Sequence, residues 1–463
     1  MRADAMRWLW KRMHKEKILS RFIDILLALL ILLGISYRFV NMDWDSGALL
    51  HPDEYGLTNT LTRLSVPASL GNYFNTREST LSPYDKYDLD GEKVADGPDN
   101  RMRWGQLPML LIRLISEAIN TTGYTELRRT GRYVNALMDV GTLLILFVIA
   151  RLLFHDRRIA LLGTALSSLA VMQIQQSHFM TVDNFSVFFC MLTLLSAVKI
   201  ARLEIVRRDQ TSVFRLTKKA WLWFGLFGLF LGMTIACKIN HVVLGVMVVV
   251  AAFIAIAEIK VHSKKELNRV IWLGFWMCAF SAGVMVLTFR VFQPMSFRAE
   301  MGNTSFFTWQ INKDWWDSML VSISESSGIG GGPPSEQWAH RTPVVFPWIN
   351  MVFYGMGIPL GLAVWVAGCL GLYRIFRSRT TEWKALLIPV FWSFFFVFFM
   401  GTRFVKCIRY MLPVYPTLCL LAGWGLVSLW RRCGGRRRIF PALAGLLVVG
   451  GTLLWSTTFV KTI

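Results

Sequence analysis

Residues 18–54 read ILSRFIDILLALLILLGISYRFVNMDWDSGALLHPDE, an apolar run that ends in a polar and acidic segment. The run from Ile18 to Val40 is long enough to cross the hydrocarbon core of a bilayer as an α-helix. It is followed closely by His51-Pro52-Asp53-Glu54. Two adjacent carboxylates beside a bilayer are costly to keep there, which favours a functional site. The sequence therefore predicts a membrane helix with an acidic site just beyond its end.

The composition of the whole chain agrees with a membrane protein. Of its 463 residues, 54% are apolar and 17% are charged, and the mean hydropathy is +0.44. A soluble chain has nearer 45–50% apolar and about 25% charged residues. The first apolar run is too long for a signal peptide, and no small-residue cleavage site follows it, so we expect it to remain uncleaved.

The net charge of +21 does not indicate nucleic-acid binding in such a chain. Lys and Arg lie in short loops, where they set the topology because cytoplasmic loops carry the excess of positive charge. The seven cysteines fall mostly inside apolar segments and show no Cys-x-x-Cys or Cys/His spacing. The sequence therefore predicts neither a zinc site nor a disulfide framework.

We predict an all-α polytopic membrane protein with about eleven transmembrane helices. They are expected at 18–40, 131–153, 159–176, 182–201, 220–237, 240–259, 270–291, 346–373, 385–402, 407–430 and 439–460. The short apolar segment from Gln106 to Ile119 carries two charged residues, and we expect it to lie in the outer interface. Five basic loops then fall on the same side as the basic N-terminus, namely 151–158, 202–219, 260–269, 374–384 and 431–438.

This threading divides the chain into four parts. A basic cytoplasmic N-terminus (1–17) precedes a catalytic transmembrane module (18–291), which contains a first external loop at 41–130. A second external loop (292–345), rich in Gly, Pro, Ser and Trp, leads to a C-terminal transmembrane module (346–463). The N-terminus is expected in the cytoplasm, and both long loops, with the acidic site, outside it.

Two acids are candidates for chemistry on the external side. Asp53 could act as a general base that takes a proton from an attacking hydroxyl. Asp183 lies at the outer end of another predicted helix, and the two acids could hold an acceptor or a metal between them. Either aspartate could instead cap the helix that follows it.

Cations on the external side are candidates for binding a phosphate. They are Arg103, Arg132, Lys238, Arg403, Lys406 and Arg409. Lys238 could also extend from a helix end to the lipid headgroups. Arg409 opens the segment Arg409-Tyr410-Met411-Leu412-Pro413, and an arginine there could bind a phosphate through two hydrogen bonds. Topology does not account for cations on this side, which strengthens the functional interpretation.

The pairs Asp43-Trp44-Asp45 and Asp88-Leu89-Asp90 have the spacing of metal-binding DxD motifs. Such pairs are common by chance, and the chain shows no cytosolic nucleotide-binding domain that would use them. We do not expect either pair to bind a metal.

The order of these motifs resembles the GT-C glycosyltransferases. The residues that carry the resemblance are the acidic pair after the first helix, the acid in the next outer turn, and the late segment Arg409-Tyr410-Met411-Leu412-Pro413-Val414-Tyr415-Pro416. The pattern looks most similar to polyprenyl-phosphate-sugar-dependent enzymes related to protein O-mannosyltransferases and aminoarabinose transferases. The chain lacks the C-terminal soluble domain of larger members, which puts the recognition of a protein acceptor in doubt.

The resemblance implies a GT-C fold, a sugar donor linked through one phosphate to a polyprenol, and transfer with inversion outside the cytoplasm. It implies Asp53 and Glu54 as the catalytic residues, with Asp53 as the general base and Glu54 beside it shaping the acceptor site. Asp183 matches the second acidic position of the family, and Lys238 matches a lysine that contacts the carrier phosphate. The residues expected to bind substrate are His51, Arg103, His178, Asp183, Lys238, Arg403, Arg409 and Tyr410.

The expected partners are the polyprenyl-phosphate sugar, an acceptor that is a protein, lipid or glycan, and membrane lipids, with no nucleic acid. No cofactor is assigned, although a divalent metal could assist. A transporter or flippase for a lipid-linked sugar is the main alternative, and it predicts charges or broken helices near mid-membrane and internal repeats. A non-catalytic assembly protein is a further alternative, but it makes no use of external acids facing external cations.

Overall fold

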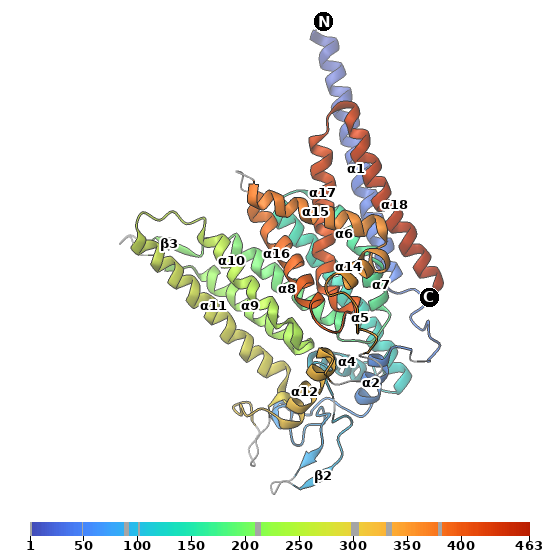
Figure 1. The fold of residues 1–463 in the computed structure, drawn as a ribbon, viewed down its shortest axis with the longest axis vertical. Helices are drawn as coiled ribbons and strands as arrows, with labels where there is room; N and C mark the ends of the chain where they lie inside the picture. The colour runs from blue at the N-terminus through green and yellow to red at the C-terminus, as the bar shows by residue number, and fades with distance from the viewer. Residues whose placement is uncertain are drawn as a thin grey trace.

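The computed structural model describes residues 2–48, 50–87, 92–100, 102–208, 214–297, 305–329, 336–377 and 382–463. For residues 2–17, 19 and 20 it describes the backbone alone. The long helices are α1 (Arg2–Tyr37), α5 (Tyr124–Phe154), α8 (Asp183–Ala201), α9 (Lys218–Cys237), α10 (Val246–Ile256), α11 (Lys264–Phe292), α15 (Ile358–Arg377), α16 (Glu382–Gly401), α17 (Tyr415–Arg432) and α18 (Ile439–Thr462). They form a bundle, and the polypeptide between them gathers mainly at its two ends (Figure 1).

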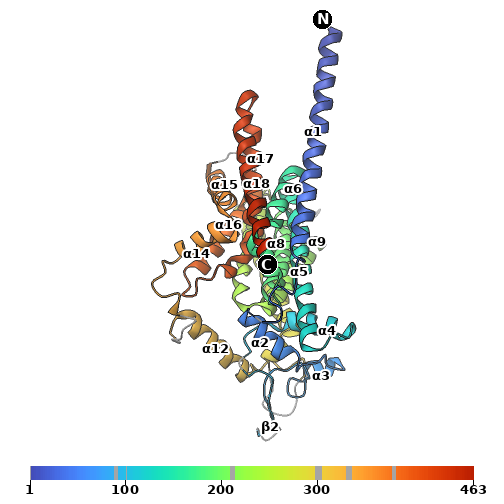
Figure 2. The same ribbon diagram turned by 90° about the vertical axis from the view of Figure 1, so that its right-hand side faces the viewer.

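The shorter elements complete the fold. The helices among them are α2 (Pro52–Leu61), α3 (Leu70–Phe74), α4 (Gln106–Ala118), α6 (Arg157–Ser168), α7 (Val171–Ser177), α12 (Lys313–Ser327) and α14 (Val345–Asn350), with 3-10 turns η1 (Ile239–Gly245) and η4 (Ile408–Val414). Strands β1 (Lys86–Tyr87) and β2 (Lys93–Ala95) pair antiparallel, as do β3 (Val206–Arg208) and β4 (Phe214–Leu216). Two views show α2, α4, α12 and β2 together at the end of the bundle far from the N-terminus (Figures 1 and 2).

The protein is a multi-pass membrane protein, as predicted. Nine helices in the described part are long and apolar enough to cross a bilayer, and the bent pair α6–α7 adds a tenth if it counts as one crossing. The predicted count of eleven is not confirmed. The first predicted segment, 18–40, lies within α1 up to Tyr37. The predicted interfacial segment is helical as α4, while its place in the interface stays a prediction.

One predicted segment, 346–373, is not a continuous helix. α14 passes into a π-helical turn (Met351–Gly355), and α15 starts only at Ile358. Gly357 breaks the helix with a φ of +78°, in a position where a side chain would collide with Trp455. Hydrophobicity alone does not reveal this break, because the residues on both sides of it are apolar.

α8 lies in the centre of the bundle and is buried along most of its length. It packs against α5, α9 and α10, so apolar residues on all of its faces meet neighbouring helices rather than lipid. A second apolar cluster lies beneath the segment between α1 and α5, where Leu57 and Leu61 of α2 meet Phe185 of α8 and Ile112 of α4. This cluster fixes that segment against the end of the bundle at which α8 begins.

α1 is attached to the bundle by a buried polar network. Arg38 Nε donates to Asp139 Oδ2 at 2.7 Å, and the Arg38 guanidinium also donates to the backbone carbonyl of Ser168 at 2.7 Å. That carbonyl belongs to the last turn of α6, just before the 57° bend between α6 and α7. Asp139 also accepts from Gln173 and Ser177 of α7. The network therefore satisfies polar groups at the bend that would otherwise face an apolar interior.

Asp139, in the predicted membrane segment 131–153, is the acid of this pair. Asp139 is midway along α5 and is 1% exposed. A mid-helix charge of this kind is one feature that the transporter alternative predicts. Here, however, the charge is bonded on several sides within the protein, so the pair serves to join α1, α5 and α7.

We expect Arg38→Met to lower the free energy of unfolding by roughly 3–5 kcal/mol, because it leaves the Asp139 carboxylate buried without its cation. Thermal unfolding of the purified protein in detergent measures this loss. The double variant Arg38→Met/Asp139→Leu should recover much of the stability. Arg157→Met is the matched control, since its 3.6 Å pair with Asp24 is largely exposed on the arginine side and contributes under about 1 kcal/mol. Equal losses in the two arginine variants would contradict the assigned role.

Candidate functional site

The segment that carries the acidic pair is held in place by Arg132 of α5. Arg132 Nε and Nη2 donate to the two oxygens of Glu54, each at 2.7 Å. The same guanidinium donates to Asp45 at 2.9 and 3.1 Å and to the carbonyl of Met42 at 2.7 Å. All three charged side chains are fully buried. Arg132 therefore neutralises two carboxylates and fixes α2 on the end of α5.

Glu54 also fixes the turn between α7 and α8. Its Oε1 accepts from the backbone N–H of Met180 at 2.8 Å. Asn135 lies three residues after Arg132 on the buried face of α5. It donates to the carbonyls of Gln176 and Phe179, both at 2.7 Å. Because this turn leads directly into α8, Glu54 sets the position of α2 and of Asp183 together.

Arg128 adds a second clamp one helical turn before Arg132. It donates to Asp43 Oδ1 at 2.7 Å and to Asp45 Oδ1 at 3.3 Å. Burial acts to raise the pKa of Asp45, but the hydrogen bond and charge of Arg132, together with the charge of Arg128, hold that pKa below its usual value. Asp45 is therefore ionised at neutral pH. The Asp43-Trp44-Asp45 pair thus binds arginines of α5, whereas Asp88-Leu89-Asp90 lies outside the described residues.

Asp53 points away from this buried network toward Arg409. Its Oδ2 lies 2.6 Å from Arg409 Nη1, and its side chain is 29% exposed. His51 is the N-cap residue of α2, and its Nε2 lies 3.0 Å from the same guanidinium nitrogen. No side chain caps α2, so the capping interpretation of Asp53 is wrong. Arg409 is supplied by η4, more than 350 positions further along the chain.

Asp183 forms a second ion pair beside the first. It is the first residue of α8, and its Oδ1 lies 2.6 Å from Lys238 Nζ. The capping interpretation of Asp183 is wrong as well, because no side chain caps α8. Lys238 ends α9 in an extended conformation, which turns the chain into η1.

The Tyr410 ring links the two ion pairs. Lys238 Nζ lies 4.4 Å from the centroid of this ring, and the Arg409 guanidinium lies 5.4 Å from it. A tyrosine face attracts both cations and holds them near each other. We call the six residues the acid–cation cluster; its members are His51, Asp53, Asp183, Lys238, Arg409 and Tyr410. The structure thus brings together six residues that the sequence placed in four separate segments.

The cluster can accept an anion. It holds two carboxylates and two permanent cations, and the N-termini of α2 and α8 point toward it with their positive helix dipoles. A phosphate that entered between Lys238 and Arg409 would compete with Asp183 and Asp53 for these cations. The carboxylates of Asp53 and Asp183 would then be released from Arg409 and Lys238.

Four predicted site residues lie outside the cluster. Glu54 is buried on Arg132, as described above. His178 is 2% exposed and lies 2.8 Å from the carbonyl of Ile174 and 2.9 Å from that of Val40. Arg103 pairs with Glu325 of α12, and the Arg403 guanidinium is exposed over the ring of Phe399 at 4.3 Å. Glu54, His178 and Arg103 hold elements together in this structure, and Arg403 faces outward.

Two of the further candidate cations are also occupied within the protein. Arg132 is saturated by carboxylates and does not reach the cluster. Lys406 is 5% exposed and donates to the carbonyl of Phe404 at 2.9 Å. Burial lowers the pKa of Lys406.

Sequence reasoning missed two contributors. Arg128 anchors Asp43 and Asp45, and its spacing of four residues from Arg132 places both arginines on one helix face, which is a detectable signal. Phe179 packs against the His51 ring with centroids 4.6 Å apart. Nothing in the local sequence distinguishes this phenylalanine from the other aromatic residues of the chain.

The described residues contain no group of three His, Cys, Asp or Glu side chains that could hold a metal ion. One oxygen of each cluster carboxylate pairs with a cation of the protein, Asp53 with Arg409 and Asp183 with Lys238.

The fold and part of the sequence match known proteins. The family model described as dolichyl-phosphate-mannose-protein mannosyltransferase matches residues 122–295, which is less than half of the chain. The archaeal oligosaccharyltransferase AglB from Archaeoglobus fulgidus, solved with an inhibitory peptide and a dolichol-phosphate, aligns with a TM-score of 0.59 and 13% identity over 96% of this chain. ArnT from Cupriavidus metallidurans in the apo state aligns with a TM-score of 0.50 and 16% identity over 94% of this chain.

These likenesses establish the fold. The chain has the fold of the GT-C membrane glycosyltransferases, which confirms the resemblance in its motifs. It spans 56% of the length of the AglB chain and 74% of the ArnT chain. A comparison with curated protein sequences finds no match.

The contact between His51 and Arg409 predicts a dependence of stability on pH. Burial, and then the charge of Arg409, lower the pKa of His51 in the folded protein. The unfolded chain then binds a proton more readily, so the free energy of unfolding is highest above about pH 6.5 and falls as the pH decreases below it.

We therefore expect the melting temperature to fall less between pH 7.5 and pH 5.5 in His51→Gln than in the wild type. Thermal unfolding in detergent at the two pH values measures the difference. His340→Gln is the matched control, because His340 is exposed. The same fall in His51→Gln and the wild type would show that His51 does not carry this dependence.

Proposed function

Because the chain has the GT-C fold, we propose that it is a glycosyltransferase that moves a sugar from a polyprenyl-phosphate carrier to an acceptor hydroxyl. The observation that supports this most is the acid–cation cluster, where Asp53 faces Arg409 at 2.6 Å and Asp183 faces Lys238 at 2.6 Å. The cluster offers a carboxylate base and two cations at one place. Those are the groups that such a transfer requires.

The carrier phosphate binds between Lys238 and Arg409 in this proposal. Arg409 then leaves Asp53 for the phosphate, since a guanidinium binds phosphate through paired hydrogen bonds. The Asp53 carboxylate becomes available to accept a proton only once the donor has bound. This order limits contact of an activated base with water before the sugar arrives.

The transfer itself follows from this arrangement. Asp53 takes the proton of the acceptor hydroxyl while its oxygen bonds to the anomeric carbon of the sugar. The bond between that carbon and the phosphate oxygen breaks, and the electron pair leaves with the polyprenyl phosphate. Lys238 and Arg409 stabilise the charge that develops on the leaving group. Attack opposite the leaving group inverts the anomeric configuration.

The neighbouring residues have positioning roles. Neutral His51 accepts a hydrogen bond from Arg409 and keeps the guanidinium at the N-terminus of α2. Asp183 holds Lys238, and Tyr410 holds both cations. Glu54, expected from the sequence to be catalytic, acts here through Arg132 and Met180 and does not reach the substrate.

The site is proposed to face the outside of the cell, with the N-terminus in the cytoplasm. The described residues of the basic loops 151–158, 202–219, 260–269 and 374–384 lie at the opposite end of the bundle from the cluster, where residues of all four regions line one cavity. Cytoplasmic loops carry the excess of Lys and Arg, which supports this orientation. The acceptor is a protein, lipid or glycan on the external side.

A flippase for a lipid-linked sugar receives less support. Its predicted mid-membrane charges are represented by Arg38 and Asp139, which are bonded to each other and to α7 in a rigid joint. The partly exposed carboxylate of Asp53 instead lies at the end of the bundle, where an acceptor can reach it once Arg409 has moved to the donor phosphate. Bond cleavage separates the two functions, because a flippase moves its lipid intact.

We expect Asp53→Asn to lower kcat by about 10²- to 10⁴-fold, the usual contribution of a general base. Release of polyprenyl phosphate from a synthetic polyprenyl-phosphate sugar measures this rate. Binding of the donor should change little, because the substitution leaves Lys238 and Arg409 in place. Asp317→Asn is the control, since Asp317 is exposed and pairs with Lys313 on α12. Full turnover by Asp53→Asn would rule out its role as the base.

Lys238→Met and Arg409→Met should each raise the KM for the donor by about 10- to 100-fold, since each removes a charged hydrogen bond to phosphate. The same assay over a range of donor concentrations measures this. Arg403→Met removes an external cation that lies outside the cluster, and its KM should stay within about twofold of the wild type. If Arg403→Met weakened donor binding as much as Arg409→Met, the phosphate site would be misplaced.

A further inference from the structure

A cavity of about 750 Å³ lies at the end of the bundle opposite the acid–cation cluster. α8 begins at Asp183, in the cluster, and ends at Ala201, in the wall of the cavity. A helix of 19 residues is about 28 Å long, close to the ~30 Å thickness of a hydrocarbon core. The cavity and the cluster therefore lie near opposite faces of the membrane.

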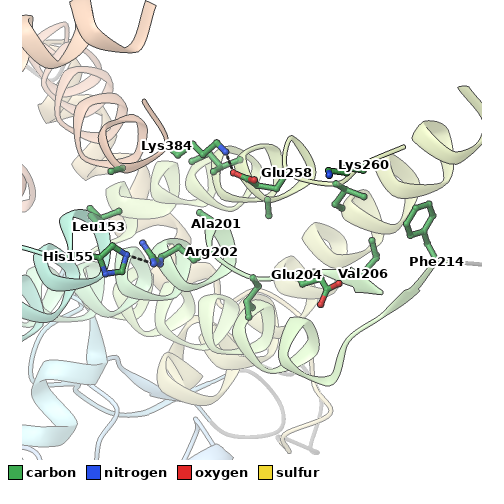
Figure 3. Close-up of a pocket in the computed structure, with 15 residues that line it drawn as sticks. Leu153, His155, Ala201, Arg202, Glu204, Val206, Phe214, Glu258, Lys260 and Lys384 are labelled. Atoms are coloured by element: carbon green, nitrogen blue, oxygen red, sulfur yellow. Dashed lines mark hydrogen bonds and ion pairs between the residues drawn. The ribbon is translucent and has the colours of Figure 1, made fainter. Parts of the chain in front are cut away.

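The ends of α5, α8 and α10, the start of α16 and the β3–β4 hairpin form the wall of this cavity (Figure 3). Part of the wall is apolar, with Leu153, Val206, Phe214, Ile254 and Ile259. A second cavity of about 520 Å³ adjoins the first and shares Arg202, Leu203 and Glu204 with it. The two cavities thus form one recess with an apolar wall and a polar rim.

The rim of this recess carries more positive than negative charge. Its carboxylates are Glu204 and Glu258. Its cations are Arg202, Arg215, Lys218, Lys219, Lys260 and Lys384. Among the described residues that line the recess there are thus four more cations than carboxylates, and this excess attracts anions.

Three of these cations have partners within the chain, namely Arg202, Lys384 and Arg215. Arg202 donates to His155 Nε2 at 2.6 Å and to the carbonyl of Leu152, which completes the C-terminus of α5. Lys384 pairs with Glu258, as Figure 3 shows. Lys218, Lys219 and Lys260 are exposed, and in the described part of the chain no carboxylate lies within ion-pairing distance of them. These three lysines remain available to a ligand.

We propose that this recess binds an anionic glycerophospholipid of the surrounding leaflet, with its phosphate at the lysine rim and an acyl chain along the apolar wall. Basic pockets between transmembrane helices on the cytoplasmic side bind such headgroups, and that leaflet is rich in anionic lipids. The ammonium groups of lysines bind phosphate as point charges. The apolar wall gives a lipid an advantage over a free phosphate ion, which has no chain to bury. This inference rests on the orientation given under the proposed function, with the recess on the cytoplasmic side, but not on glycosyl transfer itself.

The test uses the full chain, purified in detergent and freed of bound lipid. Phosphatidylglycerol, phosphatidylcholine, a polyprenyl monophosphate and inorganic phosphate are titrated separately, and native mass spectrometry measures the binding of each. The expected result is one phosphatidylglycerol bound at least tenfold more tightly than phosphatidylcholine or inorganic phosphate. Equal binding of the two phospholipids, or stronger binding of inorganic phosphate than of phosphatidylglycerol, would overturn the assignment. Polyprenyl monophosphate is expected at the acid–cation cluster, so displacement of phosphatidylglycerol by it would also overturn the assignment.

The variant Lys218→Gln/Lys260→Gln locates the site. Both side chains are exposed, so the substitutions should leave folding intact, and they should weaken phosphatidylglycerol binding by about 30-fold, the loss expected for two charges near an anionic headgroup. Arg436→Gln/Arg437→Gln removes two exposed cations from a basic loop outside both cavities and should change binding less than threefold. Equal losses in the two double variants would mean that lipids respond to overall charge alone, which would overturn the proposal.

Discussion

The arrangement of the proposed active site depends on one buried guanidinium. Arg132 binds both oxygens of Glu54 and both oxygens of Asp45, and Glu54 in turn accepts the N–H of Met180. Burying such charges is expensive, and removing one partner from a buried pair costs about 3–5 kcal/mol. The segment between α1 and α5 and the turn before α8 therefore have one favourable position relative to α5. Asp53 and Asp183 are brought to the same place as a result.

Asp53 and Glu54 are adjacent in the sequence but bind different partners, because they lie on a helix. Successive residues on an α-helix point about 100° apart, so when Glu54 turns inward to Arg132, Asp53 faces outward to Arg409. The buried Glu54 thereby fixes the helix that presents the partly exposed Asp53. Pro52 favours this start of α2, since its fixed φ suits the first turn of a helix.

Much of the fold could be predicted from the sequence, because lipid exposure forces long apolar runs that are easy to locate. Segments 131–153 and 220–237 fall within α5 and α9, and segment 182–201 begins one residue before α8 and ends with it. The prediction of one continuous helix over 346–373 was wrong, because a π-helical turn and Gly357 break the apolar run without changing its hydropathy. The number of crossings depends on how α1 and the bent α6–α7 pair are counted.

More of the residues of the candidate site than of their roles could be predicted from the sequence. His51, Asp53, Asp183, Lys238, Arg409 and Tyr410 all carry signals of residue type and membrane side, and the structure brings them together. Glu54 and His178 have the same signals, yet both are buried on partners that only the three-dimensional fold supplies. Arg103 binds Glu325, a residue of the second external loop that local sequence does not connect with it.

The central claim is that the Arg132 clamp holds an acid beside two cations that receive a phosphate. A cryo-electron microscopy structure of the protein with a bound polyprenyl monophosphate tests this most directly. The account predicts the phosphate about 3 Å from Lys238 and Arg409, with Arg409 drawn away from Asp53 and Arg132 still bound to Glu54. A phosphate bound away from these two cations, or Arg132 leaving Glu54 to bind it, would contradict the account.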